Sequence, residues 1–169
     1  MQKKKIEFLI QEAKRRNPDA FTELMQFYMQ DMYKVALAIL MNDEDAADAI
    51  QDTILSCWEN LDSLKEPRYF KTWMTRILIN KSYDIRKNSQ VFLQLDEYAE
   101  PAAPDEYHLE FREALGSLSE RYRIIMTLFY SEDFSVKEIA SLLHLPESTV
   151  RTRLQRGREK LAFYYKDSR

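Results

Sequence analysis

The sequence predicts an all-α fold, with two small helical domains joined by a flexible acidic linker and a helix-turn-helix in the C-terminal domain. The chain of 169 residues contains only two glycines, so β-hairpin turns and glycine-rich phosphate loops have few places to form. Strong helix formers, among them Leu, Met, Glu, Lys and Arg, dominate the composition. Apolar residues also recur at helical spacing on both sides of a stretch rich in acids and prolines.

Four helices are expected in the N-terminal domain, residues 1–88. They cover Ile6–Arg16, Asp19–Met41, a segment that starts after a cap at Asn42 or Asp43, and Arg68–Lys87. The first ends at Asn17, because a residue that precedes proline disfavours the helical conformation, and Asp19 can cap the second. On the fourth helix Phe70 and Trp73 share the helical spacing of Ile77, so we expect both to lie mostly in the core.

Residues 89–107 form the predicted linker, because they lack helical periodicity and contain Pro101 and Pro104 among acidic residues. Helices resume in the C-terminal domain, residues 108–169. Ser117 or Ser119 is expected to cap a helix that runs to about Tyr130.

Several function classes are excluded by what the sequence lacks. The single cysteine, Cys57, allows no disulfide framework and no cysteine-based zinc site, and His108 and His144 lie far apart. No nucleophile–base pair is recognisable, so we expect no enzyme activity, no cofactor and no small-molecule substrate. No apolar run approaches the ~20 residues of a membrane span. The basic N-terminus lacks a signal-peptide pattern, which predicts a cytoplasmic protein.

The net charge of −3 conceals alternating blocks of opposite charge. Residues 42–64 contain acids and no Lys or Arg, whereas residues 65–87 are strongly basic. Residues 88–113 are acidic again, and the part from 121 onward is basic. Two basic blocks separated by an acidic one indicate two surfaces that face a polyanion such as nucleic acid. The alternative is that each block is only the solvated face of a helix.

Residues 135–161 have the pattern of a helix-turn-helix. Ser135 caps a short helix that ends at Leu143, with Glu138 at the capping-box position, and Pro146 can begin the second helix. Small residues followed by arginines on that second helix fit a DNA major groove, where hydroxyls reach phosphate and Arg reads guanine. The candidate contacts are Ser148, Thr149, Arg151, Thr152, Gln155 and Arg156. The alternative is an amphipathic hairpin with a basic solvent face.

These residues resemble the C-terminal promoter-binding domain of the extracytoplasmic-function (ECF, group 4) sigma factors of the sigma-70 family. The family pattern is S-x-x-E-I-A-x-x-L…P-x-x-T-V-R-x-R-L-x-R-x-R-x-x-L, which the sequence fills from Ser135 to Leu161. The N-terminal domain resembles the same family through DAF (19–21), DAIQDTILSCW (48–58) and FKTWMTRILINKSYDIRK (70–87). The sequence departs from the family at His144, where members often have Gly, and at Glu147, at the start of the second helix of the helix-turn-helix, which is the recognition helix.

The resemblance implies a bacterial alternative sigma factor that binds core RNA polymerase, recognises the −35 and −10 promoter elements, melts the DNA and initiates transcription. It assigns polymerase binding to Asp45, Asp48, Gln51 and Asp52. It assigns the −35 element to the second helix of the helix-turn-helix. It assigns the −10 element to a set of polar and basic residues: Ser63, Lys65, Arg68, Arg76, Asn80, Lys81, Arg86 and Lys87. Aromatic residues interleave with these cations, as binding of single-stranded DNA requires.

The resemblance also implies control by an anti-sigma factor, in that family commonly membrane-anchored. In that family the acidic linker runs toward the RNA exit path of the polymerase. An equal alternative is that the linker only keeps the protein soluble. Two other functions remain open on the residues alone. One is a stand-alone helix-turn-helix transcriptional regulator that dimerises through its N-terminal helices, and the other is a helical adaptor that binds only proteins.

Overall fold

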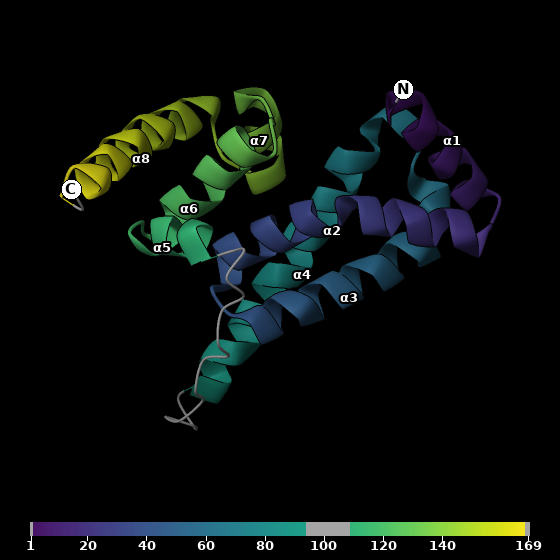
Figure 1. The fold of residues 1–169 in the computed structure, drawn as a ribbon, viewed down its shortest axis with the longest axis horizontal. Coiled ribbons are helices and arrows are strands. Elements are labelled where there is room, and N and C mark those ends of the chain that lie inside the picture. Colours follow the sequence, from purple (N-terminus) through teal and green to yellow (C-terminus); the bar gives the residue numbers. More distant parts are fainter. Residues whose placement is uncertain (1, 94–108, 168–169) are drawn as a thin grey trace.

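The computed structural model describes residues 2–93 and 109–167, and in these ranges the chain is helical without any strand, as predicted. The elements form two bundles, which lie beside each other in Figure 1. The N-terminal bundle consists of α1 (Gln2–Lys14), α2 (Pro18–Leu40), α3 (Asp43–Glu59), η1 (Leu61–Ser63), η2 (Pro67–Tyr69) and α4 (Phe70–Leu93). The C-terminal bundle consists of α5 (Leu109–Gly116), α6 (Glu120–Met126), η4 (Thr127–Ser131), α7 (Val136–Leu143) and α8 (Glu147–Asp167).

Side-chain caps start α2 and α3. The Asn17 side chain accepts from the backbone N–H groups of Asp19 and Ala20, at 3.1 and 3.4 Å, and Pro18 occupies the first turn. The predicted cap at Asp19 is therefore wrong, because proline is itself tolerated in a first turn and α2 begins one residue earlier. Asn42 caps α3, as one of the two predicted candidates, and accepts from the N–H of Asp45 at 2.9 Å.

The core of the N-terminal bundle lies where α2, α3 and α4 pack on one another, with α1 against α2. Its buried side chains include Leu24, Met32, Phe70, Met74 and Leu78, each at most 1% exposed. Phe70 is thus core, as predicted, while Trp73 is half-buried against it. Burial of side chains of this size stabilises the fold by about 1.5–3 kcal/mol each, which is what holds so short a bundle together.

The C-terminal bundle contains the predicted capping box and an irregular turn before it. Ser135 accepts from the N–H of Glu138 at 3.1 Å, and Glu138 accepts in return from the N–H of Ser135 at 3.2 Å. After α6, for which Ser119 is the N-cap residue without a side-chain cap bond, the helix widens into the π-helical turn η4. The sequence predicts one regular helix here, so this turn is a departure from expectation.

The two bundles pack directly against each other. Helix α2 contacts α6 and η4, and α4 contacts α7. Helix α4 also continues to Leu93, beyond its expected end at Lys87. The rest of the predicted linker, with its acids and prolines, lies outside the described residues, and so does His108 at the start of the predicted C-terminal domain.

Candidate functional site

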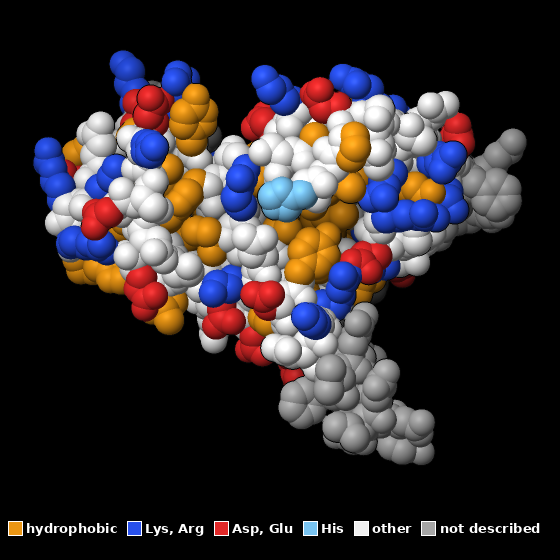
Figure 2. Space-filling model, turned by 180° about the vertical axis from the view of Figure 1, so that it is seen from behind, with side chains coloured by type: hydrophobic (Ala, Val, Ile, Leu, Met, Phe, Trp, Pro, Cys, Tyr) orange, Lys and Arg blue, Asp and Glu red, His pale blue; other side chains and the backbone are white. Residues whose placement is uncertain are grey.

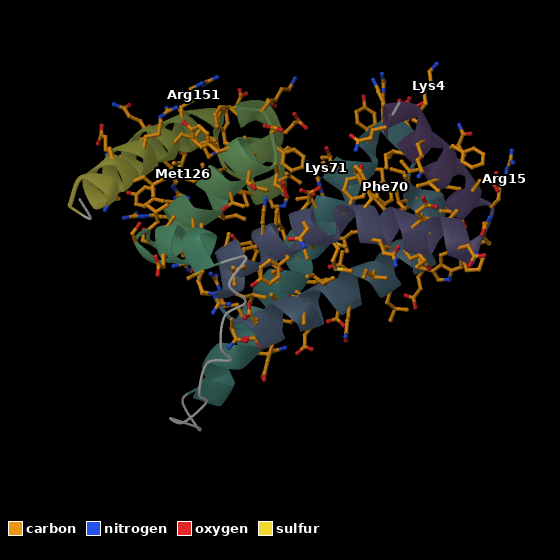
Figure 3. The ribbon with its side chains drawn as sticks, viewed as in Figure 1. Lys4, Arg15, Phe70, Lys71, Met126 and Arg151 are labelled. Atoms are coloured by element: carbon orange, nitrogen blue, oxygen red, sulfur yellow. The ribbon has the colours of Figure 1, made fainter. Side chains whose placement is uncertain are left out.

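The recognition-helix candidates lie on α8, on the face opposite its packed side. Val150 and Leu154 are buried at 0% and 3% exposed and dock α8 on the bundle. Ser148, Arg151, Thr152, Gln155 and Arg156 are exposed, and Thr149 is half-buried. Their spacing of three and four residues places the exposed ones along one stripe. In Figure 3 Arg151 points outward from α8, away from Met126 on α6 beneath it. The stripe is therefore accessible over at least two turns.

The turn between α7 and α8 has the geometry that a helix-turn-helix needs. His144 takes the left-handed conformation, with φ 56° and ψ 45°, and its N–H bonds to the carbonyl of Ala140. The N–H of Leu145 also reaches that carbonyl, at 3.0 Å. These two hydrogen bonds to the same carbonyl end α7, and the chain then turns toward α8. His144 thus has the role that Gly often has at a helix C-terminus.

A glycine sets how closely α8 approaches α6. A Cβ placed on Gly157 would come within 2.8 Å of the Met126 sulfur, well inside ordinary contact. The backbone of α8 therefore lies directly on Met126, and the bare Gly157 position allows this. Arg158 and Lys160 continue the basic face: Arg158 donates to the hydroxyl of Tyr130 at 2.8 Å, and Lys160 lies 5.3 Å above the Tyr122 ring. Figure 2 shows Lys and Arg side chains gathered over the C-terminal bundle.

The candidate polymerase-binding residues share the outer side of α3. Asp48, Gln51 and Asp52 are exposed, and Asp45 is half-buried near the capped start of the helix. Leu55 continues this side one turn later and is a large apolar residue that is 58% exposed. Sequence reasoning missed Leu55, although its position outside the apolar stripe of α3 was the available signal.

The candidate −10 residues divide between a loop and α4. In the loop, Lys65 and Arg68 are exposed, and Arg68 pairs with Glu66 at 2.6 Å while stacking 4.8 Å above the Tyr69 ring. The Ser63 hydroxyl donates to the carbonyl of Asn60 at 2.7 Å and accepts from the Trp73 indole at 3.2 Å. Helix α1 holds this loop from behind, since Lys14 donates to the carbonyl of Leu64 at 2.5 Å. The loop thus has a fixed backbone and exposed cations.

On α4 itself the candidates have different surroundings. Asn80 and Lys87 are exposed and Lys81 is half-buried. Arg76 donates to the Ser141 hydroxyl of α7 at 3.1 Å, and Arg86 forms an ion pair with Glu120 of α6 while lying 4.8 Å from the Tyr83 ring. The structure therefore does not bring all eight candidates onto one open surface, because the C-terminal bundle engages two of them.

Each bundle has a cavity at its surface. One of about 610 Å³ lies between α1, α2 and the start of α4, next to Arg68, Phe70 and Lys71, and Asp133 of the C-terminal bundle forms part of its wall. An apolar groove of about 170 Å³ runs between α5, α6 and α8, lined by Leu115, Leu118, Met126, Tyr130 and Leu161 among others.

Three buried groups have raised pKa values. Burial raises the pKa of the Cys57 thiol to about 12, so this cysteine is unreactive at neutral pH. Burial, with a smaller contribution from Asp31, raises the pKa of Tyr28 to about 12. Burial likewise raises the pKa of Glu132 to about 8, and Asp31 adds to that rise. Of the three, only Glu132 can change its charge near neutral pH.

Two absences hold for the described ranges. No helix there is long and apolar enough to cross a bilayer. No group of three or more His, Cys, Asp or Glu within those ranges is arranged to hold a metal ion.

Two family models match the chain, one on each bundle. Residues 24–90 match the model for sigma-70 region 2, and residues 108–161 match the model for sigma-70 region 4. The ECF RNA polymerase sigma factor SigW of Bacillus subtilis is 27% identical over 94% of this chain and 95% of its own length. The RNA polymerase sigma factor SigV of the same organism is 31% identical over 77% of this chain and 81% of its own length.

Two solved complexes contain a chain with this fold. The sigma factor RpoE, solved with the anti-sigma factor NepR from Bartonella quintana, has a TM-score of 0.72 and 25% identity, covering 88% of this chain and 98% of its own. CnrH, solved with the cytosolic domain of CnrY, has a TM-score of 0.71 and 24% identity, covering 98% of this chain and 99% of its own. The likeness thus extends over both bundles.

Proposed function

Because this chain belongs to the extracytoplasmic-function sigma factors of the sigma-70 family, we propose that it binds core RNA polymerase and directs it to promoters with −35 and −10 elements. The observation that carries the proposal is the presence of both region 2 and region 4 in one chain, in that order. A regulator that binds an operator alone needs a helix-turn-helix but no region 2.

The −35 element is assigned to the exposed stripe of α8. Major-groove recognition needs a helix with several adjacent side chains that no other part of the protein covers. Ser148, Arg151, Thr152, Gln155 and Arg156 meet that requirement. Thr152 donates to the carbonyl of Ser148 at 2.9 Å, so its hydroxyl oxygen still has room to accept a hydrogen bond.

The −10 element is assigned to the loop before α4 and to the cations along α4. Melted DNA offers phosphates and unstacked bases, which require cations beside aromatic faces. Arg68 beside Tyr69, and Arg86 beside Tyr83, supply such pairs. Differential binding of the separated strand then opens the duplex without a catalytic step, so the chain acts as an initiation factor rather than an enzyme.

Polymerase binding is assigned to the outer side of α3. The carboxylates of Asp48 and Asp52 suit a basic partner helix, and the exposed Leu55 adds apolar contact area in the same place. We further propose that the domains extend to Leu93 and from residue 108, that the protein acts in the cytoplasm, and that an anti-sigma factor controls it, as the RpoE complex suggests.

The experiment that tests this function mixes the purified chain with core RNA polymerase. Co-elution of the two in gel filtration is expected, and footprints on promoter DNA should require both components. A footprint made by the chain alone, together with no association with core polymerase, would instead identify a stand-alone regulator.

A further inference from the structure

Three cations of α4 contact the C-terminal bundle. The Lys71 ammonium donates to the carbonyl of Glu132 at 3.0 Å, the Arg76 guanidinium donates to the Ser141 hydroxyl at 3.1 Å, and Arg86 pairs with Glu120. Figure 3 places Lys71 between the two bundles. These contacts extend along most of α4, which is the helix assigned to −10 DNA. The same cations cannot bind phosphate while they serve the C-terminal bundle.

Further polar contacts fix the bundles at the other end of α2. Arg112 of α5 pairs with Asp43 at the start of α3, and Tyr33 also donates to that carboxylate, at 2.5 Å. Arg123 of α6 donates to the carbonyl of Ala38 at 3.1 Å. Ala38 belongs to the last turn of α2, whose carbonyls lack partners within the helix, so a cation is favourable there.

One carboxyl group of the C-terminal bundle is inserted into the N-terminal bundle. The Glu132 side chain is 1% exposed, and its oxygens accept no hydrogen bond from any described residue. The groups that face it are Asp31 and Lys34 of α2 and Lys71 of α4, whose ammonium lies 4.0 Å from one carboxyl oxygen. A buried carboxylate without full compensation is costly, so the protonated acid is the form that fits this position.

The backbone around Glu132 is shaped to present it. It follows the π-helical turn η4, and its N–H bonds to the carbonyl of Thr127 at 3.1 Å. Asp133 next to it has φ 60°, a conformation that residues other than glycine rarely adopt. Phe134 then returns to the core, with the Lys71 ammonium 5.5 Å from its ring. An irregular helix end and a left-handed residue thus flank the inserted side chain.

We propose that this packing is a closed form of the free sigma factor, in which the C-terminal bundle covers the −10-binding face of α4 and the inserted Glu132 side chain fastens the two bundles. The proposal rests on the proposed function, since it assigns the α4 cations to promoter DNA. Promoter DNA and the C-terminal bundle compete for Arg76 and Arg86, while Lys71 fastens the same face of α4 to Glu132. The free chain is therefore a poor binder of −10 DNA, and separation of the bundles exposes the site.

The closed form should depend on pH. Burial first, and Asp31 second, raise the pKa of Glu132 from 4.5 to about 8, while Lys71 and Lys34 oppose the rise. An acid with a raised pKa stabilises the closed form fully below its ordinary pKa, and this contribution is lost as pH rises through the raised value. Between about pH 5 and pH 8 each unit should raise the equilibrium constant for opening by up to about tenfold.

Energy transfer between two dyes on the full chain measures this opening. Gln11→Cys on α1 and Glu159→Cys on α8 supply exposed labelling sites, whereas Cys57 is buried and does not react. The labelled chain should lose transfer efficiency between pH 6 and pH 8.5. Glu132→Gln keeps the shape of the protonated acid, so it should hold the high value across that range. Equal efficiency of both proteins at all pH values would overturn the role of Glu132.

Binding of a single-stranded oligonucleotide with a −10 sequence tests the coverage of α4. The double variant Glu120→Arg with Ser141→Arg places like charges against Arg86 and Arg76 and leaves the α4 residues intact. Its affinity should exceed that of the wild type by tenfold or more. The control variant Glu113→Arg with Ser117→Arg makes the same charge change on exposed positions of the same bundle. An equal gain in both variants would overturn the proposal.

Two control measurements test the folding of the variants and the function of the wild type. Far-ultraviolet circular dichroism should show unchanged helicity in every variant. Promoter-directed transcription by the wild type with core polymerase tests the proposed function independently. If transcription occurs while the opening variant neither separates the bundles nor gains affinity, the closed form is wrong and the sigma-factor function stands.

Discussion

His144 has an unfavourable backbone conformation that the turn between α7 and α8 requires. Its left-handed backbone costs a residue with a side chain about 1–2 kcal/mol, and glycine avoids that cost. Because the His144 side chain is exposed, its removal loses little packing. His144→Gly should therefore raise the free energy of unfolding by about 1 kcal/mol, measured by urea denaturation. His144→Ala is the control and should give no gain, and a glycine variant less stable than wild type would contradict the account.

Arg151 and Arg156 test base recognition one residue at a time. Helix-turn-helix proteins contact bases mainly with the first turns of the second helix, where Arg151 lies. Arg151→Ala should cost about 1–3 kcal/mol and relax preference at one −35 position, and Arg156→Ala should do the same or weaken all promoters alike. Transcription from a library of −35 mutants separates these outcomes. Lys160→Ala is the control, and no change in preference for any variant would remove α8 as the reader.

Residue-level prediction succeeded where the cause is local. The capping box of Ser135 and Glu138 depends on residues three apart, so spacing alone predicts it. Glu132 was not predicted as a buried group, because the charged residues that face it, Asp31, Lys34 and Lys71, lie far away in the sequence.

At the scale of the element, α3 tests the polymerase-binding assignment. Asp48→Arg or Asp52→Arg reverses a charge on an exposed side chain, so the fold should be kept while a basic partner is repelled. Affinity for core polymerase should fall in both variants, at constant helicity. Glu23→Arg on α2 removes only an exposed pair with Lys5 and is the matched control. If both α3 variants bind as well as the control, α3 is not the contact.

The elements themselves could largely be predicted, and the exceptions have physical causes. Proline at a first turn is compatible with the helix, so Asn17 rather than Asp19 caps α2. The π-helical turn η4 has no periodicity of its own in so short a segment, and it contacts α2, α6 and α7, which are distant or separate elements that the sequence does not place beside it. Periodicity identifies an apolar face but not which helix will cover it.

At the scale of the whole molecule, the linker prediction can be tested by limited proteolysis. Residues 94–107 lack apolar periodicity and contain Pro101 and Pro104, so the first cut is expected between Asn88 and Tyr107. Two helical fragments should result, and mass spectrometry identifies them. Glu132→Gln should not move the first cut, which serves as the control. A primary cut inside residues 135–161 would contradict the division into two domains.

The arrangement of the bundles is the part of the molecule that the sequence left open. Two domains with separate apolar faces are equally compatible with an extended pair and with the packed pair in Figure 1. The packed arrangement depends on contacts between the bundles, such as the hydrogen bond from Arg76 to Ser141. Such a contact cannot be recognised before the two surfaces are known. The sequence assigns Arg76 and Arg86 to DNA, and the structure adds a competing partner within the same chain.

The central claim is that this chain is the specificity factor of a bacterial RNA polymerase, and run-off transcription tests it most directly. Core polymerase is supplied with a promoter carrying matched −35 and −10 elements, with and without the chain. A discrete transcript is expected only when the chain is present, and it should be lost when either element is scrambled. A transcript of equal yield without the chain, or from the scrambled templates, would contradict the account.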